Sequence, residues 1–364
     1  MNEERPVSDR ETSGTEPAVT PLGTPPEPPV RPRAGDILHT SPELAVGEGD
    51  VRGAEGGDDE ILAGTSLWKD AWKRLLRNKL AVFGMVVVGF IILASLLGPP
   101  IIRWTTGYTY DFIPPDTALN KAFAPFQDPQ GNFSWTHPMG TDAAGRDLLA
   151  RVLIGGRISL MVGIISTIVS LIIGVTYGAT AGYLGGKVDA VLMRIVDVLY
   201  SLPYMMIIIV LLAFFGGRSP MGQLVLLFIA LGAVSWLTMA RIVRGQVISL
   251  KNQEFVLAAR ATGVSTAKII FKHLVPNALG PVIVYATLTI PSVMLQEAFL
   301  SFLGLGVQAP LASWGSLASE GIQNIAIFPW QLIFPGVTMA LTLFSLNFLG
   351  DGLRDALDPQ MRKF

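Results

Sequence analysis

Residues 158–186 read ISLMVGIISTIVSLIIGVTYGATAGYLGG, a run without a single charged side chain. An uncharged apolar run of about 18 residues or more can cross the hydrocarbon core of a bilayer as one helix. Together with similar runs elsewhere, it predicts six membrane-spanning helices, near residues 80–102, 158–183, 198–217, 219–240, 274–296 and 331–350. Pro203 predicts a bend or entry point in the third helix, and Pro281 and Pro291 predict a kink or break in the fifth. The fold class is therefore expected to be all-α, that of a polytopic membrane protein.

The overall composition supports this class. Half of the residues are hydrophobic and 15% are charged, whereas about 25% are charged in an average soluble protein. The chain has no cysteine, which excludes disulfides, thiolate catalysis and thiolate metal sites.

The first 66 residues differ from the rest of the chain. They contain 9 of the 25 prolines, and 14 acidic against 5 basic side chains. Such a segment buries too little apolar surface to offset its chain entropy. We therefore expect residues 1–66 to form a disordered, acidic, proline-rich tail in the cytosol. A solvated tail without a fixed role and a regulatory tail are both open.

Basic residues near the ends of the spans predict the orientation of the chain. Residues 67–79 are expected to form an amphipathic helix that lies on anionic headgroups. Its basic residues, which argue for a cytosolic N-terminus, are Lys69, Lys73, Arg74, Arg77 and Lys79. Six crossings then return the C-terminus to the cytosol and make the basic connection 243–277 cytosolic as well.

The predicted spans contain no ionisable side chain, and the three histidines lie in unrelated segments. Ion-coupled carriers and intramembrane enzymes tend to place such groups at membrane depth. No glycine-rich segment ends in the Lys-Ser/Thr pair of a phosphate-binding loop. We therefore expect no catalytic site, no cofactor and no metal site. If the chain moves a solute uphill, the energy must come from another subunit.

The connection 243–277 is where a soluble partner could bind. Residues 254–262 (EFVLAARAT) favour a helix that Gly263 can end, and Ser265 is a candidate N-cap for a second short helix. Pro276 is expected to close this unit before the fifth span. On periodicity alone, partner docking and an ordinary cytosolic loop are both possible.

This connection resembles the coupling loop of ATP-binding-cassette importer permeases, where an acid-Ala-Ala triplet precedes a glycine and a later proline. The residues that match are Ala258, Ala259, Gly263 and Pro276. Leu257 stands where the acid is expected, and Glu254 lies one turn earlier. Other segments resemble C-type permeases of the dipeptide, oligopeptide and nickel family, namely 137–142 (HPMGTD), 145–147 (GRD), 156–160 (GRISL), 297–306 (EAFLSFLGLG) and 313–315 (SWG).

The resemblance covers roughly residues 67–359 and implies a type I importer permease domain over residues 80–359, in the cell (inner) membrane. It implies a complex with a homologous second permease, two cytosolic ATP-binding subunits and an extracytoplasmic substrate-binding protein, which together import dipeptides or oligopeptides. The residues that it implies for coupling to the ATPase are Glu254, Ala258, Ala259, Arg260 and Gly263. A permease for nickel or another small solute is the alternative within the family. A self-contained channel or a membrane scaffold is the alternative from another class.

Five residues are candidates for the external loop or gate. Asp142, Arg146 and Asp147 are expected to pair among themselves rather than to contact substrate. Glu297 is expected just past the fifth span, as a satisfied or gate-lining carboxylate. Trp314 is expected to be an interfacial anchor on a short outer helix.

Overall fold

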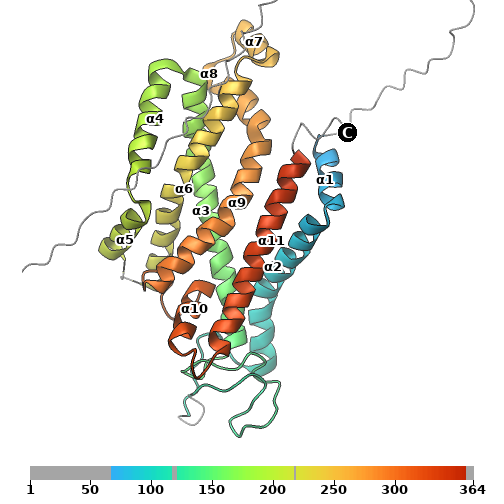
Figure 1. Cartoon of the computed structure of the whole chain (residues 1–364), viewed down its shortest axis with the longest axis vertical. Helices are drawn as coiled ribbons and strands as arrows, with labels where there is room; N and C mark the ends of the chain where they lie inside the picture. The colour runs from blue at the N-terminus through green and yellow to red at the C-terminus, as the bar shows by residue number, and fades with distance from the viewer. Residues whose placement is uncertain (1–66, 117–120, 217–218, 358–364) are drawn as a thin grey trace, which may run out of the picture. The chain divides into compact units, whose positions relative to one another are not determined.

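The computed structural model describes residues 67–116, 121–216 and 219–357. The tail 1–66 and the last basic residues, Arg362 and Lys363, lie outside the described residues. Within them the chain is almost wholly helical, and the only β-type pairing is two isolated bridges in the loop after the first span. The all-α class is confirmed (Figure 1).

The helices of the described residues follow one another in this order: α1 (Leu67–Arg77), α2 (Lys79–Thr106), α3 (Leu148–Leu184), α4 (Gly186–Ser201), α5 (Tyr204–Phe215), α6 (Pro220–Leu250), α7 (Glu254–Ala261), α8 (Thr266–Lys268), the π-helical turn η1 (Ile269–Leu274), α9 (Val275–Phe302), α10 (Trp314–Gln323) and α11 (Trp330–Leu357). Figure 1 shows the long helices side by side, with α1, α7 and α8 at one end and α10 at the other.

Five helical stretches among the described residues are long and apolar enough to cross a membrane, and a bent helix pair raises the number to six. The bent pair is α4 and α5, which meet at 77°. The bend or entry point that Pro203 predicts in the third span near 198–217 is therefore confirmed, and α4 begins before that predicted range. Leu202 is extended (φ −80°, ψ 143°) because the ring of Pro203 disfavours helical geometry in the residue before it.

The fifth span is longer than its uncharged run and is not broken. α8, η1 and α9 form one stretch from Thr266 to Phe302, which passes through both Pro281 and Pro291 without interruption. Of the predicted kink or break, the break is therefore absent, and the kink stays a prediction.

The second span begins ten residues before its predicted start at 158, because Asp147 caps α3 by accepting the N–H of Ala150 at 2.9 Å. The fourth span also continues beyond its run, so that Arg241 and Arg244 lie on the last turns of α6.

A stripe of glycines on α3 lets α6 approach its backbone. Gly174, Gly178 and Gly182 are spaced by four residues and share one face of the helix. A Cβ atom on Gly174 would lie 2.6 Å from the Cβ of Met239, and one on Gly182 would lie 2.8 Å from a backbone carbonyl of α6. Small residues at such a contact allow the close helix packing that associates helices in lipid.

α1 packs on the end of α11 through one face. Ala71 and Leu75 are buried, together with Ala356 of α11. Trp72 and Leu76 point outward and are about half exposed. Asn78 ends α1 and caps α2 by accepting the N–H groups of Leu80 and Ala81. The amphipathic helix is therefore present, and its position on a membrane surface stays a prediction.

We expect Gly178→Ala to destabilise the helix bundle by about 1–3 kcal/mol, because overpacking forces the two backbones apart. The added Cβ would press on the backbone of Ala240. Gly245→Ala on α6 is the matched control, since nothing lies within 4 Å of its added Cβ. Thermal unfolding of the purified protein in detergent checks both variants. A Gly178→Ala protein as stable as the parent would contradict the close helix contact.

Candidate functional site

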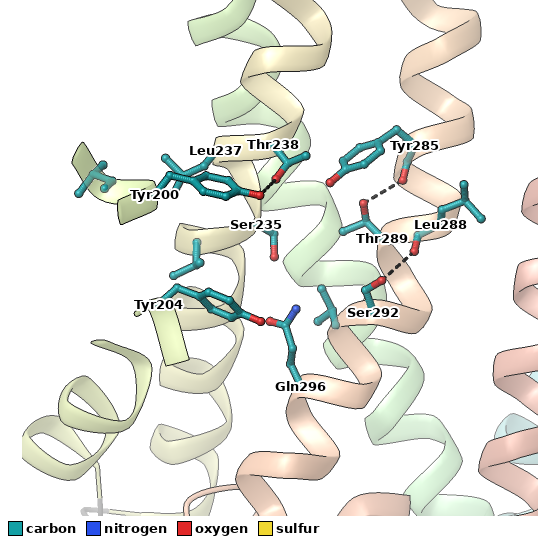
Figure 2. Close-up of a pocket in the computed structure, with 13 residues that line it drawn as sticks. Tyr200, Tyr204, Ser235, Leu237, Thr238, Tyr285, Leu288, Thr289, Ser292 and Gln296 are labelled. Carbon is teal, nitrogen blue, oxygen red and sulfur yellow. Dashed lines mark hydrogen bonds between the residues drawn. The ribbon is translucent and has the colours of Figure 1, made fainter. Parts of the chain in front are cut away.

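A cavity of about 320 Å³ lies between α4, α5, α6 and α9 (Figure 2). Its polar lining residues are Tyr200, Tyr204, Ser235, Thr238, Tyr285, Thr289, Ser292 and Gln296. No charged side chain lines it. The α6 and α9 residues come from the middle of these long helices, so the cavity lies far from the ends of both.

The cavity keeps free hydrogen-bonding capacity. Thr289 and Ser292 donate their hydroxyls to backbone carbonyls one turn earlier, at 2.8 and 3.2 Å. Their oxygens can still accept. The buried Oε1 of Gln296 has no hydrogen-bond partner among the described residues. The cavity can therefore accept N–H donors from a solute, while its apolar wall tolerates varied side chains.

From the sequence, we expect spans two to five to line the pathway, chiefly through backbone and small polar groups. α4, α5, α6 and α9 line the cavity, whereas α3 contributes no lining residue. The side chains of Tyr200, Tyr204 and Tyr285 are large phenols, which the prediction missed. One signal was present in the sequence: positions 285, 289, 292 and 296 place polar groups along one face of an apolar helix.

Polar contacts hold α4 against α6 beside the cavity. Arg244 donates to both oxygens of Asp189, at 2.5 and 2.6 Å. Arg241 donates to Asp197 at 2.8 Å, one turn closer to the cavity. These pairs join residues that are 55 and 44 positions apart in the sequence.

At one end of the helix bundle, α7 and the following turn carry the five predicted coupling residues. Glu254, Ala258, Arg260 and Gly263 are exposed, but Ala259 is buried. Gly263 has a φ of +76°, the left-handed conformation that ends α7.

Two of these coupling residues face the protein itself. Ala259 packs with Val256 against the apolar face of η1. Arg260 places its guanidinium 5.0 Å from the ring of Tyr183, at the end of α3, and donates to its hydroxyl at 3.2 Å. Both residues therefore orient α7 on the body.

The chain after Gly263 differs from the predicted second short helix. Ser265 forms no side-chain cap, and α8 passes directly into η1 and α9. Pro276 does not close the unit but lies in the first turn of α9. Its ring would clash with the carbonyl of Lys272 in a regular α-helix, and the wider π turn immediately precedes it.

The loop between α2 and α3, which the sequence predicts to be external, is fixed by a buried cluster of charges. Arg151 is 1% exposed and donates to Asp142 at 2.7 Å and to both oxygens of Glu320 at 2.7 and 3.0 Å. Arg146 donates to Asp142 at 2.6 Å. The predicted pairing of Asp142 with Arg146 is confirmed. Asp147 is not part of it, and lies 3.0 Å from His137 Nδ1.

Glu297 and Trp314 lie deeper than predicted. Glu297 is inside α9, 1% exposed, and accepts hydrogen bonds from Ser301 at 2.6 Å and Ser313 at 2.7 Å. Its predicted place past the fifth span is wrong, since α9 runs on to Phe302. Trp314 begins the predicted short outer helix, α10, but is 1% exposed and donates to the carbonyl of Val152 at 2.9 Å. It is a packing residue and not an interfacial anchor.

Comparison with known proteins places the chain in a family. Residues 174–363 match the family described as binding-protein-dependent transport system inner membrane component, and residues 66–126 match the N-terminal transmembrane domain of oligopeptide transport permease C. The chain belongs to the binding-protein-dependent transport permeases. This membership makes it a multi-pass transport component of the inner membrane, and it confirms the predicted family and the importer permease fold.

The relatives of this permease match it over most of both chains. The oligopeptide transport system permease protein OppC of Haemophilus influenzae is 49% identical over 83% of this chain and 91% of its own length. OppC of Escherichia coli is 50% identical over 82% and 93%. The dipeptide transport system permease protein DppC of Bacillus subtilis is 42% identical over 82% and 87%.

A more distant likeness is to a solved structure, the MetNI methionine ABC transporter in inward-facing conformations. It has a TM-score of 0.46 and 20% identity, and it covers 58% of this permease and 96% of its own chain.

The charge cluster of this permease should be sensitive to loss of its central cation. We expect Arg151→Met to cost about 3–5 kcal/mol of stability, because it leaves the buried Asp142 with a single cationic partner. Arg157→Met on the same helix is the control. Arg157 is exposed, so its replacement should change stability by no more than about 0.5 kcal/mol. Thermal unfolding and limited proteolysis of the outer loop measure both, and equal effects would contradict the role of Arg151.

Proposed function

We propose that this chain is the permease subunit of an ATP-driven importer and forms half of a translocation pathway for dipeptides or oligopeptides. Its relatives support this proposal, since they are named as oligopeptide and dipeptide transport permeases. The high identity over nearly the full length of these relatives supports a shared kind of solute.

The observation that carries the proposal is the chemistry of the cavity. Peptides differ in their side chains but share backbone N–H and C=O groups. Phenol, hydroxyl and amide groups, such as those of Tyr204, Ser292 and Gln296, can bind these groups in any peptide. The absence of charge from the lining avoids selecting one side-chain charge. A site near the middle of the spans also suits alternating access, in which helices rock around a central site.

The energy for transport is proposed to enter at α7 from two cytosolic ATP-binding subunits, and this chain hydrolyses no ATP itself. The docking surface combines the exposed Glu254 and Ala258 with the partly exposed apolar side chains of Phe255 and Leu257, 38% and 49% exposed. Leu257, where the family pattern has an acid, adds apolar contact. Glu254 supplies the negative charge.

The contacts of α7 give this docking surface a physical route to the cavity. Val256 and Ala259 pack against Ile269, Ile270 and Leu274 of η1. η1 continues without a break into α9, which carries a wall of the cavity. When the two ATPases close on ATP, they would draw α7 inward, and α9 would move with it.

The remaining partners follow from the same proposal. A homologous second permease would complete the pathway, and an extracytoplasmic binding protein would deliver the peptide at the end that carries α10. The end of the helix bundle that carries α1 and α7 would face the cytosol (Figure 1). The basic side chains of α1, including Lys69 and Lys73, support that orientation, which places both termini in the cytosol.

We expect Gly263→Val to lower peptide uptake at least about tenfold at an unchanged level of protein in the membrane. A β-branched residue cannot readily adopt the φ of +76° found here, so the turn after α7 would change shape. Gly263→Asn is the matched control, because asparagine tolerates this conformation and should keep most of the uptake. Uptake of a labelled tripeptide by membrane vesicles checks both. Wild-type uptake by Gly263→Val would contradict the docking role of this turn.

Purification of the complete complex tests the function itself. An importer permease should bring down a second permease and ATP-binding subunits, and in liposomes its ATPase activity should rise when the binding protein and a peptide are added. Nickel ions with the same binding protein are the comparison solute. Recovery of this chain alone, or stimulation by nickel and not by peptide, would reject peptide import.

A further inference from the structure

Tyr200 stands at the end of the cavity that lies toward α7. It occupies the last turn of α4, and its hydroxyl lies 3.3 Å from that of Thr238 on α6. Figure 2 shows its ring reaching across from α4 to Thr238, with Ser235 between it and Tyr204. The position of this ring therefore sets how wide the cavity is at that end.

A cation outside the cavity lining holds the ring. The guanidinium carbon of Arg241 lies 4.3 Å from the centroid of the Tyr200 ring, within the range of a cation–π contact. The same guanidinium donates to Asp197 at 2.8 Å. Asp197 and Tyr200 are three residues apart and so lie on one face of α4. Arg241 thus contacts two successive positions of that face.

α4 has little else to fix this ring. Among residues 186–201, all of them described, Val196 is the one buried residue. The helix is held mainly by polar contacts, including the Arg244–Asp189 pair and a hydrogen bond from Tyr177 to the Leu192 carbonyl at 2.9 Å. α4 ends at Ser201, one residue after Tyr200, and Leu202 is extended, so α5 does not continue the helix past the ring.

We propose that Arg241 and Asp197 are positioning residues that fix Tyr200 across the cavity end and so limit the size of the peptide side chains that pass it. This inference rests on the proposed passage of peptides through the cavity. The cation and the ion pair act from outside, and neither contacts the peptide. A freed Tyr200 would widen the end and favour bulky side chains over small ones.

A thiol in the cavity reports the position of the ring without any transport. The chain has no cysteine, so Ser235→Cys gives this subunit a single thiol beside Tyr200. In the assembled transporter, we expect Arg241→Gln to raise the rate of its reaction with a maleimide about two- to fivefold, the range that a lost cation–π contact would give. Tyr200→Leu should raise the rate at least as much, and Arg241→Lys, which keeps the cation, should stay near the parent.

Arg194→Gln is the matched control. Arg194 is an exposed cation on α4 with no ion pair among the described residues, so its removal should leave the thiol rate unchanged. A rate for Arg241→Gln equal to the parent, or equal to that of Arg194→Gln, would overturn the positioning role.

Uptake gives the second readout. Arg241→Gln should raise the uptake of a tripeptide with a central tryptophan relative to trialanine severalfold, with Arg241→Lys restoring the parental ratio. An unchanged ratio would overturn the selectivity part of the proposal. A raised thiol rate in a complex whose parent transports no peptide would support the positioning and reject the proposed function instead.

Discussion

The contact between α3 and α6 is the interaction on which the rest of this permease depends. In lipid, apolar side chains gain little from leaving one apolar surrounding for another, so close backbone approach has to stabilise the helix pair. Gly174, Gly178 and Gly182 provide that approach. With one side of α6 packed against α3, its other side faces the cavity through Ser235 and Thr238 and contacts α4 through Arg241.

The sequence was sufficient to predict the fold class and the approximate location of the spans, but not their lengths. Spans predicted from uncharged runs end at the first charged residue, so their predicted lengths are too short wherever a helix continues past a charge. Arg244 and Glu297 nevertheless lie on long helices, because Asp189 pairs with the first and two serines donate to the second. These partners lie on other turns or other helices, some far away in the sequence. A charge that is satisfied by tertiary contact cannot be recognised from its own neighbours.

The site was predictable where local rules decide and not where packing does. Gly263 takes the left-handed conformation that its position after a helix suggested. Ala259 and Arg260 instead face the body, because the π turn of η1 places an apolar face under α7 and Tyr183 receives the arginine. Trp314 was assigned to the interface by residue type. Its ring is buried on the backbone of Gly156, a match of shapes that a sequence does not display.

Pro281 and Pro291 each remove a backbone hydrogen bond from α9, although the helix is continuous. Neither Pro281 nor Pro291 has an N–H, so the carbonyls of Asn277 and Thr287 lack their helical donors. Bending stiffness is lowest where such bonds are missing. Tyr285 lies between these two joints, a short rigid link whose tilt can differ from that of the helix on either side. If α7 receives a push as proposed, it would reach the cavity as a rotation of this link as well as a translation of the whole helix.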